Sequence, residues 1–569
     1  MLENLINLKV VAMVAALGLN TAEWSKPSKE MEAQVQKLAD AVSDISQGKA
    51  EKQSGAVNET IASIKVLADK NNDKDAQYAV GYFLQQSNQQ GSLEQALTYY
   101  EKAAKQNQLQ AMNNYGFILA ASSREPEKAK EGITWIKKAA DSGLNAARRN
   151  MSQIYLRGLG GEKQDFVKAE ELLVKATAEQ DSEAAFALSQ FYLGAGGKEK
   201  KDDEKAWKLL NDSAKLGNAS ALAALGSVLF DGKKFGDKVI PADPATAVKK
   251  FEELAAQNNP AGLRTMGELY ESGLAGVPKD FQKALENYAR AAQGNDAVAQ
   301  LRLAGYYDKG VDLDPKDNKT EVPSNAAAAL ELYRLAAQNN VPMAIYNVGV
   351  FYEEGRAVDR DATKAFGFFL QSAVNGFILG MQKTGVYYLN GAGTIKDPVA
   401  AAGWFTRSAQ AGLPEGHLSY GIVTEMGLVP QGEKDSAFMA AADSYLQASD
   451  SLNASPAVRM EALLRLGSLY LRGALVPKGD TPKPDFEKAY VYFKQAVDID
   501  PKSQLAEQAR SEVVTKLTRE QITKADATVE QLKKKREDSM KAEEAKVAAP
   551  ATTPAAPATT PATGKPKTR

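Results

Sequence analysis

Apolar residues recur at intervals of three and four along most of the chain, which is the spacing of amphipathic helices. The clearest of these segments come in consecutive pairs. In the first segment of a pair, a small residue is followed five positions later by another, as in Ala344 and Gly349 or Ala462 and Gly467. The pattern therefore predicts helix pairs that repeat in tandem along the sequence.

The second small residue marks eleven repeat units, 35 to 46 residues apart. It stands at Gly81, Gly116, Ser152, Ser189, Gly226, Gly267, Ala304, Gly349, Gly385, Gly421 and Gly467. Glycine inside a helix costs up to about 1 kcal/mol of helix propensity. Its recurrence predicts that the second helix of each pair approaches closely there, where a Cβ atom would clash.

The second segment of each pair has its own pattern, with alanine four residues before an aromatic residue, as in Ala284 and Tyr288 or Ala365 and Phe369. Glycine or asparagine follows the last helical turn, as at Gly294, which is the expected left-handed stop of a helix. Each unit thus predicts a first helix, a loop, a second helix and a short turn.

These units resemble Sel1-like repeats, which are relatives of tetratricopeptide repeats. The matching pattern is A-x4-G-x2-Y-x2-G followed by K-A-x3-W/Y/F-x3-A-A-x2-G. The resemblance implies an all-α fold, a right-handed α-solenoid of about eleven helix pairs over residues 73–502. Ser152, Ser189 and Ala304 replace the glycine, and Thr424 replaces the aromatic residue. Secreted members with two cysteines per repeat exist, but this chain has no cysteine, so no activity of that branch carries over.

Both flanks of the repeats predict further helices. Residues 28–72 predict two N-terminal capping helices joined by a turn at 47–55, because terminal repeats need a polar outer face. Residues 503–546 predict a closing helix and then a charged helix. From 519 onward the charged helix has eight basic and seven acidic residues, and we expect it to be a single solvated helix. A coiled-coil seam of Ile522, Ala525, Val529, Leu532, Arg536 and Met540 is the weaker alternative.

The two termini differ in composition from the repeats. Val10 to Ala22 is a run of 13 residues without charge. It is shorter than the roughly 20 residues of a membrane span but fits a signal-peptide core of about 7–15. We therefore expect residues 1–22 to be a signal peptide for bacterial export to the periplasm or the exterior. An uncleaved anchor and a first helix packed on the array are the alternatives. Residues 547–569, rich in Pro, Ala and Thr, predict a disordered tail that serves as a plain linker, with contact to an anionic envelope polymer or glycans on its threonines as alternatives.

The amino-acid composition excludes several kinds of binding and catalytic site. Lys and Arg number 70 against 71 Asp and Glu, which argues against a nucleic-acid partner. The chain has no cysteine and one histidine, His417, which excludes thiolate zinc sites and cysteine nucleophiles. The acidic run Asp312, Asp314 and Asp317 resembles a calcium loop but lacks its glycine and final glutamate. We expect no metal, no cofactor and no enzymatic activity.

What remains is a binding surface. By resemblance to tetratricopeptide arrays, inner positions lie three before and one, four and five after the small residue of the first helix. The candidate partner-binding residues are Tyr78, Tyr82, Asn113, Phe117, Arg149, Gln153, Arg157, Arg264, Glu268, Glu271, Tyr346, Glu353, Gln382 and Asn390. The longer loops of repeats five, seven and eleven (231–244, 311–325 and 474–485) are a second choice for contacts.

The sequence thus predicts an exported, non-enzymatic scaffold or adaptor that binds a protein or peptide partner on the concave face of the solenoid. No stable transmembrane span is expected after signal cleavage. The alternative is a structural envelope component tethered through its C-terminal charged helix and tail. A hydrolase of envelope polymers would need a converging pair of carboxylates, and neighbouring pairs such as Glu353 and Glu354 point about 100° apart on a helix.

Overall fold

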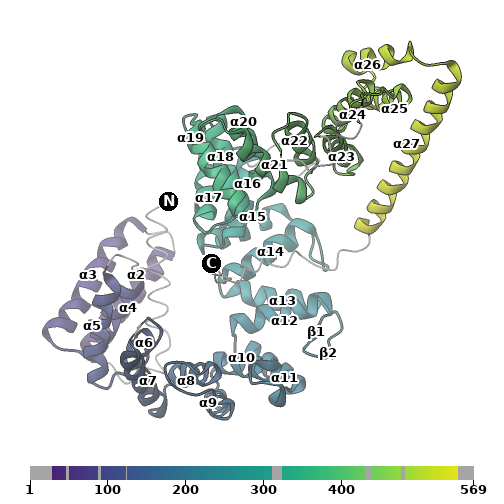
Figure 1. The fold of residues 1–569 in the computed structure, drawn as a ribbon. Coiled ribbons are helices and arrows are strands. Elements are labelled where there is room, and N and C mark those ends of the chain that lie inside the picture. The colour runs from purple at the N-terminus through teal and green to yellow at the C-terminus, as the bar shows by residue number, and fades with distance from the viewer. Residues whose placement is uncertain are drawn as a thin grey trace. The chain divides into compact units, whose positions relative to one another are not determined.

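A computed structural model describes residues 28–46, 50–86, 91–122, 125–310, 323–429, 437–475 and 481–548 of the chain. These residues form consecutive helix pairs (Figure 1). The chain divides into two compact units, one ending at Asn295 and one beginning at Asp296. The units are described separately below.

The first unit holds two capping helices and six repeats. The capping helices are α2 (Lys29–Ser46) and α3 (Ala50–Lys70). The repeat pairs are α4 (Lys74–Gln86) with α5 (Ser92–Lys105), α6 (Leu109–Ser122) with α7 (Pro126–Asp141), α8 (Asn145–Arg157) with α9 (Phe166–Ala178), α10 (Ser182–Gln190) with α11 (Asp203–Lys215), α12 (Ala219–Asp231) with α13 (Pro244–Ala256), and α14 (Pro260–Ser272) with α15 (Phe281–Gln293). In repeat four, a π-helical turn (Phe191–Ala195) and a 3₁₀ turn (Lys198–Lys200) follow α10.

The second unit holds five repeats and two terminal helices. The repeat pairs are α16 (Ala297–Lys309) with α17 (Ala326–Gln338), α18 (Pro342–Glu354) with α19 (Ala362–Val374), α20 (Ile378–Asn390) with α21 (Pro398–Gln410), α22 (Pro414–Glu425) with α23 (Ala437–Asp450), and α24 (Pro456–Leu471) with α25 (Phe486–Ile499). The terminal helices are α26 (Gln504–Val514) and α27 (Arg519–Ala548). The eleven predicted helix pairs are therefore confirmed.

The longer loop of repeat five forms a small hairpin of β1 (Lys234–Phe235) and β2 (Lys238–Val239). The strands are antiparallel, and Gly236 takes the positive φ of 64° that the turn needs. The Phe235 ring packs edge-on against Trp207 of the preceding repeat, with ring centroids 5.2 Å apart. Most of the long loop of repeat seven and part of that of repeat eleven lie outside the described residues.

The predicted close contact is confirmed in the eight repeats that have glycine at this position, by the surroundings of that glycine. A Cβ atom on Gly385 would come within 2.5 Å of the Phe405 ring, and one on Gly267 within 2.8 Å of Tyr288. These distances are well below van der Waals contact, so only a residue without a Cβ fits. In repeat two the side chain nearest to Gly116 is Ile136, which has no exposed surface and whose Cγ1 would lie 2.8 Å from a Cβ atom on that glycine.

A second recurring set of contacts connects the first helix and the loop to the start of the second helix. In repeat eight, the Asp361 side chain caps α19 by accepting from the Lys364 amide at 2.9 Å, and the Asp361 amide donates to the Tyr352 carbonyl. The Lys364 ammonium then lies over the Tyr352 ring, 5.3 Å from its centroid. The same trio occurs as Asp165, Lys168 and Tyr155; Asp202, Lys205 and Tyr192; Asp280, Lys283 and Tyr270; and Asp485, Lys488 and Tyr470.

The N-terminal cap differs from the sequence prediction in one detail. The predicted turn at 47–55 is too long, because α3 already begins at Ala50. Alanine, glutamate, lysine and glutamine open this helix, and their helix propensity outweighs the cost of Gly55. The cap itself contacts the array, since α3 packs on α4.

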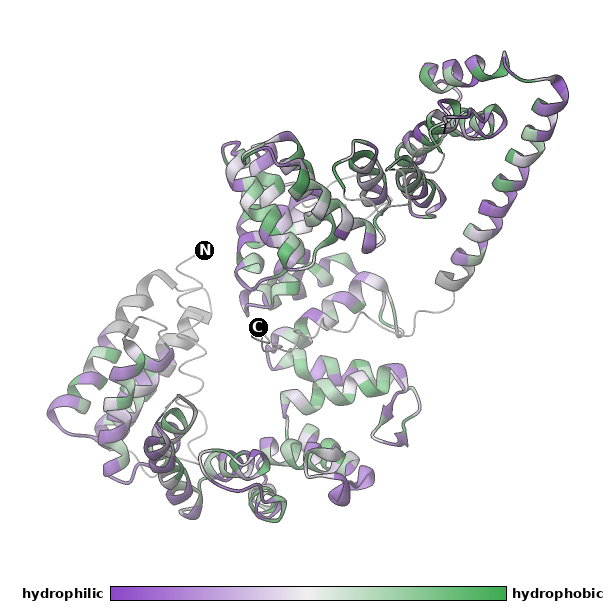
Figure 2. Cartoon of the chain, in the orientation of Figure 1, coloured by the Kyte–Doolittle hydropathy of each residue, from purple (hydrophilic) through white to green (hydrophobic). Residues whose placement is uncertain are grey.

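The expectation of a fully solvated charged helix at 519–546 is wrong for its first half. Ala525 and Val529 are 4% and 2% exposed and pack against α25. The Tyr490 hydroxyl of α25 donates to Asp526 at 2.9 Å. Figure 2 shows α27 as mostly hydrophilic, with a few hydrophobic positions along it. Ala525 and Val529, one turn apart, therefore pack the first half of the helix against α25 even though the segment is highly charged.

Candidate partner-binding surface

First helices of neighbouring repeats contact one another directly. Within the first unit α6 contacts α8 and α8 contacts α10, and within the second unit α22 contacts α24. Residues at equivalent positions of these helices therefore lie on one continuous surface. The fourteen candidate residues all belong to first helices, so their burial and partners decide which of them can meet another molecule.

In the first repeats, three candidates are largely internal. Tyr78 is buried, and its ring lies 6.0 Å from Tyr100 and 6.3 Å from Tyr82. Burial raises the pKa of Tyr82 above its ordinary value. Asn113 is also buried, and its side-chain oxygen accepts from Asn150 of the next first helix at 2.7 Å. These residues hold the array together.

Arg149 of the first unit is already paired across a helix boundary. Its guanidinium forms an ion pair with Asp181, the residue that caps α10. The pair thus links the first helices of repeats three and four.

Three further candidates lie together on α14. Arg264 and Glu268 bond to each other at 2.9 Å, one helical turn apart. Glu271 accepts from the Tyr288 hydroxyl at 2.6 Å. Each of these charges is therefore engaged inside the chain.

In the second unit, too, candidate residues pack against or bond to other side chains of the chain. Tyr346 packs between the rings of Phe369 and Phe377, with both centroid distances 5.3 Å. Glu353 accepts from Lys383 of the next first helix at 2.7 Å and from the Tyr387 hydroxyl at 3.0 Å.

The pKa of Tyr387 and a hydrogen bond of Gln382 also indicate that these candidates are engaged within the chain. Burial, followed by the charge of Glu353, raises the pKa of Tyr387 well above its ordinary value, so this hydroxyl stays a donor at neutral pH. Gln382 donates to Ser419 at 2.8 Å, which joins the first helices of repeats nine and ten.

Four candidates remain exposed: Phe117, Gln153, Arg157 and Asn390. Phe117 is 51% exposed although it is a large aromatic side chain. Phe117 and Gln153 each stand one residue after the small residue of their helix, on the contacting helices α6 and α8. Arg157 lies one turn further along α8. Within the first unit, these three residues form the part of the predicted surface that is open to a partner.

The sequence analysis missed the internal partners of the other candidates. Asn113 and Asn150 are 37 residues apart, as are Gln382 and Ser419, which is about one repeat. Two hydrogen-bonding side chains one repeat apart were therefore a usable signal for a ladder between first helices.

Other chemistry is limited among the described residues. No group of three carboxylate or imidazole side chains in them is placed to hold a metal ion. His417 lies in the first turn of α22, where burial lowers its pKa. Asp308, next to the acidic loop, pairs with Arg356, while Asp312, Asp314 and Asp317 lie outside the described residues. None of the described helices is both long and apolar enough to span a bilayer.

A family model for the Sel1 repeat matches ten segments of the chain, which cover residues 74–259, 261–296, 297–413 and 461–499. The chain therefore belongs to the Sel1 repeat family. The model does not match the interval between 413 and 461, yet the pair α22 and α23 forms there. A Cβ atom on Gly421 would lie 2.6 Å from the Tyr445 ring, as in the matched repeats. Proteins of this family typically serve as non-enzymatic scaffolds that bind protein partners.

Known relatives share part of the chain. It is 22% identical over 288 residues to chitin synthase regulatory factor 3 of Schizosaccharomyces pombe, which covers 50% of this chain and 26% of that protein. It is 27% identical over 157 residues to the chitin synthase regulator SKT5 of Saccharomyces cerevisiae, covering 28% and 21%. The aligned parts thus span about a quarter of the length of these curated relatives.

One solved structure covers most of the chain. It is c5321, a protective antigen present in uropathogenic Escherichia coli strains that displays an SLR fold. The two superpose with a TM-score of 0.56 at 21% identity, over 87% of this chain and 99% of that chain. At this identity the likeness shows the fold alone.

Proposed function

We propose that the chain is an exported, non-enzymatic adaptor that binds a protein or peptide partner on the surface formed by its first helices. The observation that carries the proposal is the exposed set Phe117, Gln153 and Arg157 on two contacting helices. An aromatic ring with an arginine and an amide beside it offers rigid apolar area and directed hydrogen bonds, which is the usual composition of interface hot spots.

The relatives support a partner-binding role in a limited way. Both curated relatives are named as regulators of chitin synthase, so each acts on another protein. In this chain the Sel1 repeats occupy most of the residues between 74 and 499, and they are the part able to present a binding surface. The tethering alternative, through the charged helix and the tail, stays a prediction: the first half of α27 contacts α25, and residues 549–569 lie outside the described residues.

The test is proximity labelling in native cells with the tag after Arg569, combined with N-terminal sequencing of the recovered chain. We expect chains that begin between Leu19 and Glu23 and one or two enriched envelope proteins. Chains that begin at Met1 among cytosolic neighbours would overturn export and leave the adaptor role standing.

The surface itself is tested with Phe117→Ala and Arg157→Ala. We expect each to reduce recovery of the enriched partner about tenfold or more, since hot-spot truncations cost about 2 kcal/mol or more. The matched control is Phe438→Ala, another exposed ring, which lies on the second helix α23. Equal recovery by all three variants would rule out this surface.

A further inference from the structure

A cleft of about 590 Å³ lies between α27 and the helices α23, α24 and α25, at the C-terminal end of the second unit. None of the fourteen candidate residues discussed above lines it. Its size falls in the range of pockets that bind small molecules and short peptide segments. It is therefore a separate surface, and its lining decides what it can accept.

Two arginines fix one end of the cleft. Arg536 of α27 donates to the carbonyls of Ser449, Asp450 and Ser451 at 3.0–3.3 Å, where α23 ends. Arg459 of α24 donates from its Nε to the Ser449 carbonyl at 3.3 Å. A cation at the C-terminus of a helix is favourable, so both guanidinium groups are held in place.

The charge of the lining is unbalanced toward cations. Arg459, Lys533, Lys535 and Arg536 face three carboxylates, Asp450, Asp498 and Glu537. Asp498 is already bonded to Lys494 on its own helix. The cleft therefore has more positive groups than carboxylates available to neutralise them, which favours an anionic occupant.

The lining also includes exposed apolar side chains. Leu446 and Leu532 are each 39% exposed and Met540 is 43% exposed, and all three line this one cleft. Each apolar Å² left in water costs about 25 cal/mol relative to burial. Grouped exposed leucine and methionine side chains on a soluble array typically mark an interaction site.

We propose that this cleft binds a short acidic, amphipathic peptide segment of a partner protein. Leucine-like side chains of the peptide would cover Leu446, Leu532 and Met540. Its carboxylates would meet Lys535 and the two arginines. Gln495 and Ser539 also line the cleft. Each donates to a carbonyl of its own helix, at 3.3 and 2.9 Å, so their side-chain oxygen atoms remain as acceptors for the N–H groups of a peptide backbone, which an aliphatic chain lacks. This inference does not depend on export or on the Phe117 surface.

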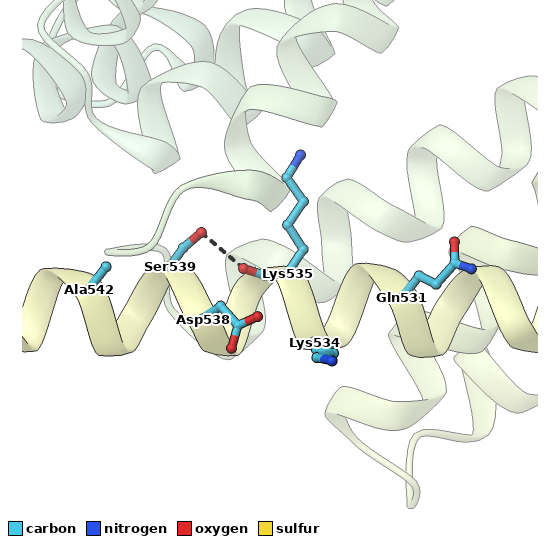
Figure 3. A pocket seen from close by; sticks show the side chains of 6 residues that line it. All are labelled: Gln531, Lys534, Lys535, Asp538, Ser539 and Ala542. Carbon is cyan, nitrogen blue, oxygen red and sulfur yellow. Dashed lines mark hydrogen bonds between the residues drawn. The ribbon is translucent and has the colours of Figure 1, made fainter.

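Neighbouring lysines of α27 provide a matched test. Figure 3 draws a separate hollow lined by residues of α27 alone, and it shows Lys534 and Lys535 leaving the helix on different sides. Lys535 lines the cleft and Lys534 does not. Lys535→Glu and Lys534→Glu change the charge of the helix equally, so any difference between them reports the cleft itself. Leu446→Glu, with Leu505→Glu on α26 as its control, tests the apolar part in the same way.

The probe is the fluorescent peptide acetyl-Glu-Leu-Leu-Glu-Glu-Leu-Leu-Glu-amide, with the Lys-for-Glu version as the charge-reversed comparison. Binding to the purified full chain is measured by fluorescence anisotropy. We expect saturable binding of the acidic peptide only. We also expect a loss of about tenfold or more in affinity, or about 1.4 kcal/mol, for Lys535→Glu and Leu446→Glu. Lys534→Glu and Leu505→Glu should stay within about twofold of the unmodified chain.

Other outcomes would overturn the proposal. No binding of the acidic peptide, or equal loss with Lys534→Glu and Lys535→Glu, would show that the cleft does not bind such a segment. Saturable binding of dodecanoate without binding of the peptide would identify an aliphatic anion as the occupant instead. Phe117→Ala should leave probe binding unchanged, so failure here and failure of the adaptor surface are distinguishable.

Discussion

Repeats nine and four solve the same packing problem with different side chains. Repeat nine sets Gly385 against the ring of Phe405. Repeat four has Ser189 and Leu210 at the corresponding positions, and both side chains have no exposed surface. The Ser189 hydroxyl donates to the Ala206 carbonyl of the second helix at 2.8 Å. The volume that leucine lacks relative to phenylalanine is thus partly supplied by the facing helix, which keeps the interior close-packed.

The comparison explains the two serine departures from the repeat pattern as compensated changes of volume, whereas repeat seven keeps a buried tyrosine, Tyr333, beside Ala304. In repeat three, Ser152 is likewise accompanied by a leucine, Leu173, at the large position of its own second helix, although the buried Ser152 hydroxyl has no hydrogen-bond partner among the described residues. Tyrosine at that position brings a further requirement, because its hydroxyl needs an acceptor. Tyr288 finds one in Glu271, four residues after the small Gly267. Repeat nine, with Phe405, has Leu389 at the equivalent place. In repeats six and nine, the residue four positions after the glycine therefore matches the polarity of the aromatic side chain on the second helix.

The largest expected effect comes from placing serine alone in repeat nine. In Gly385→Ser, the new Cβ would lie 2.5 Å from the Phe405 ring. We expect a loss of about 3 kcal/mol in the free energy of unfolding, the upper part of the usual range for overpacking. Hydrogen exchange of the amides of α20 and α21 measures it, because repeat arrays open locally. Gly403→Ser on α21 is the control, since a Cβ there meets nothing within 4 Å.

A double variant at positions 385 and 405 tests whether the serine and leucine pair of repeat four is also tolerated in repeat nine. Adding Phe405→Leu to Gly385→Ser should recover part of the loss, with a favourable coupling of about 0.5–3 kcal/mol. The serine hydroxyl would then reach the Ala401 carbonyl, the counterpart of Ala206. Additive or worse destabilisation in the double variant would show that repeats three and four depend on something other than this exchange of volume.

A smaller effect is expected from the tyrosine repeats. Tyr288→Phe removes the hydroxyl that donates to Glu271 at 2.6 Å. We expect a loss of about 1.5 kcal/mol, typical of a hydrogen bond to a charged group. The combination with Glu271→Leu recreates the pairing of repeat nine and should recover most of that loss. Thermal unfolding measures both, and Tyr270→Phe, a tyrosine over which Lys283 lies, should cost less than about 0.5 kcal/mol.

The fold could be predicted because its determinants are local. The period of three and four gives the helices, and the small residue gives the place where they touch. The docking of α27 was missed for a physical reason. Its charge composition, averaged over the segment, hides the two positions Ala525 and Val529 that decide whether it packs.

The binding surface was predictable only in part. Asn113, Glu353 and Gln382 were correctly placed on first helices, but their position on the helix does not determine the direction in which their side chains point. Each is near enough to the next first helix to bond there instead of facing a partner. Sequence spacing predicts which helix a residue belongs to and its position along that helix. Which side chain of the next first helix it contacts depends on how neighbouring repeats are rotated relative to each other.

The smallest expected effect concerns the aspartates that cap the second helices. Asp361 accepts from the Lys364 amide, and this bond, with the Lys364 side chain, lowers the pKa of its carboxyl below the ordinary 3.8. A lowered pKa means that the carboxylate stabilises the folded state above about pH 4 and that this contribution disappears as the pH falls further. Asp165 and Asp202 have lowered pKa values for the same reason.

Thermal unfolding between about pH 6 and pH 3 tests the capping aspartates against the rest of the array. The midpoint of the unmodified chain should fall steeply below about pH 4. Asp361→Asn should be less stable at pH 6 and should lose less on acidification, because asparagine caps the helix at every pH but has no charge to pair with Lys364. Asp359→Asn, on the exposed loop before it, should follow the unmodified chain. If Asp361→Asn and Asp359→Asn gave the same pH dependence, the cap would contribute no charge-dependent stability, and the Asp–Lys–Tyr trio would be held by geometry and ring contact alone.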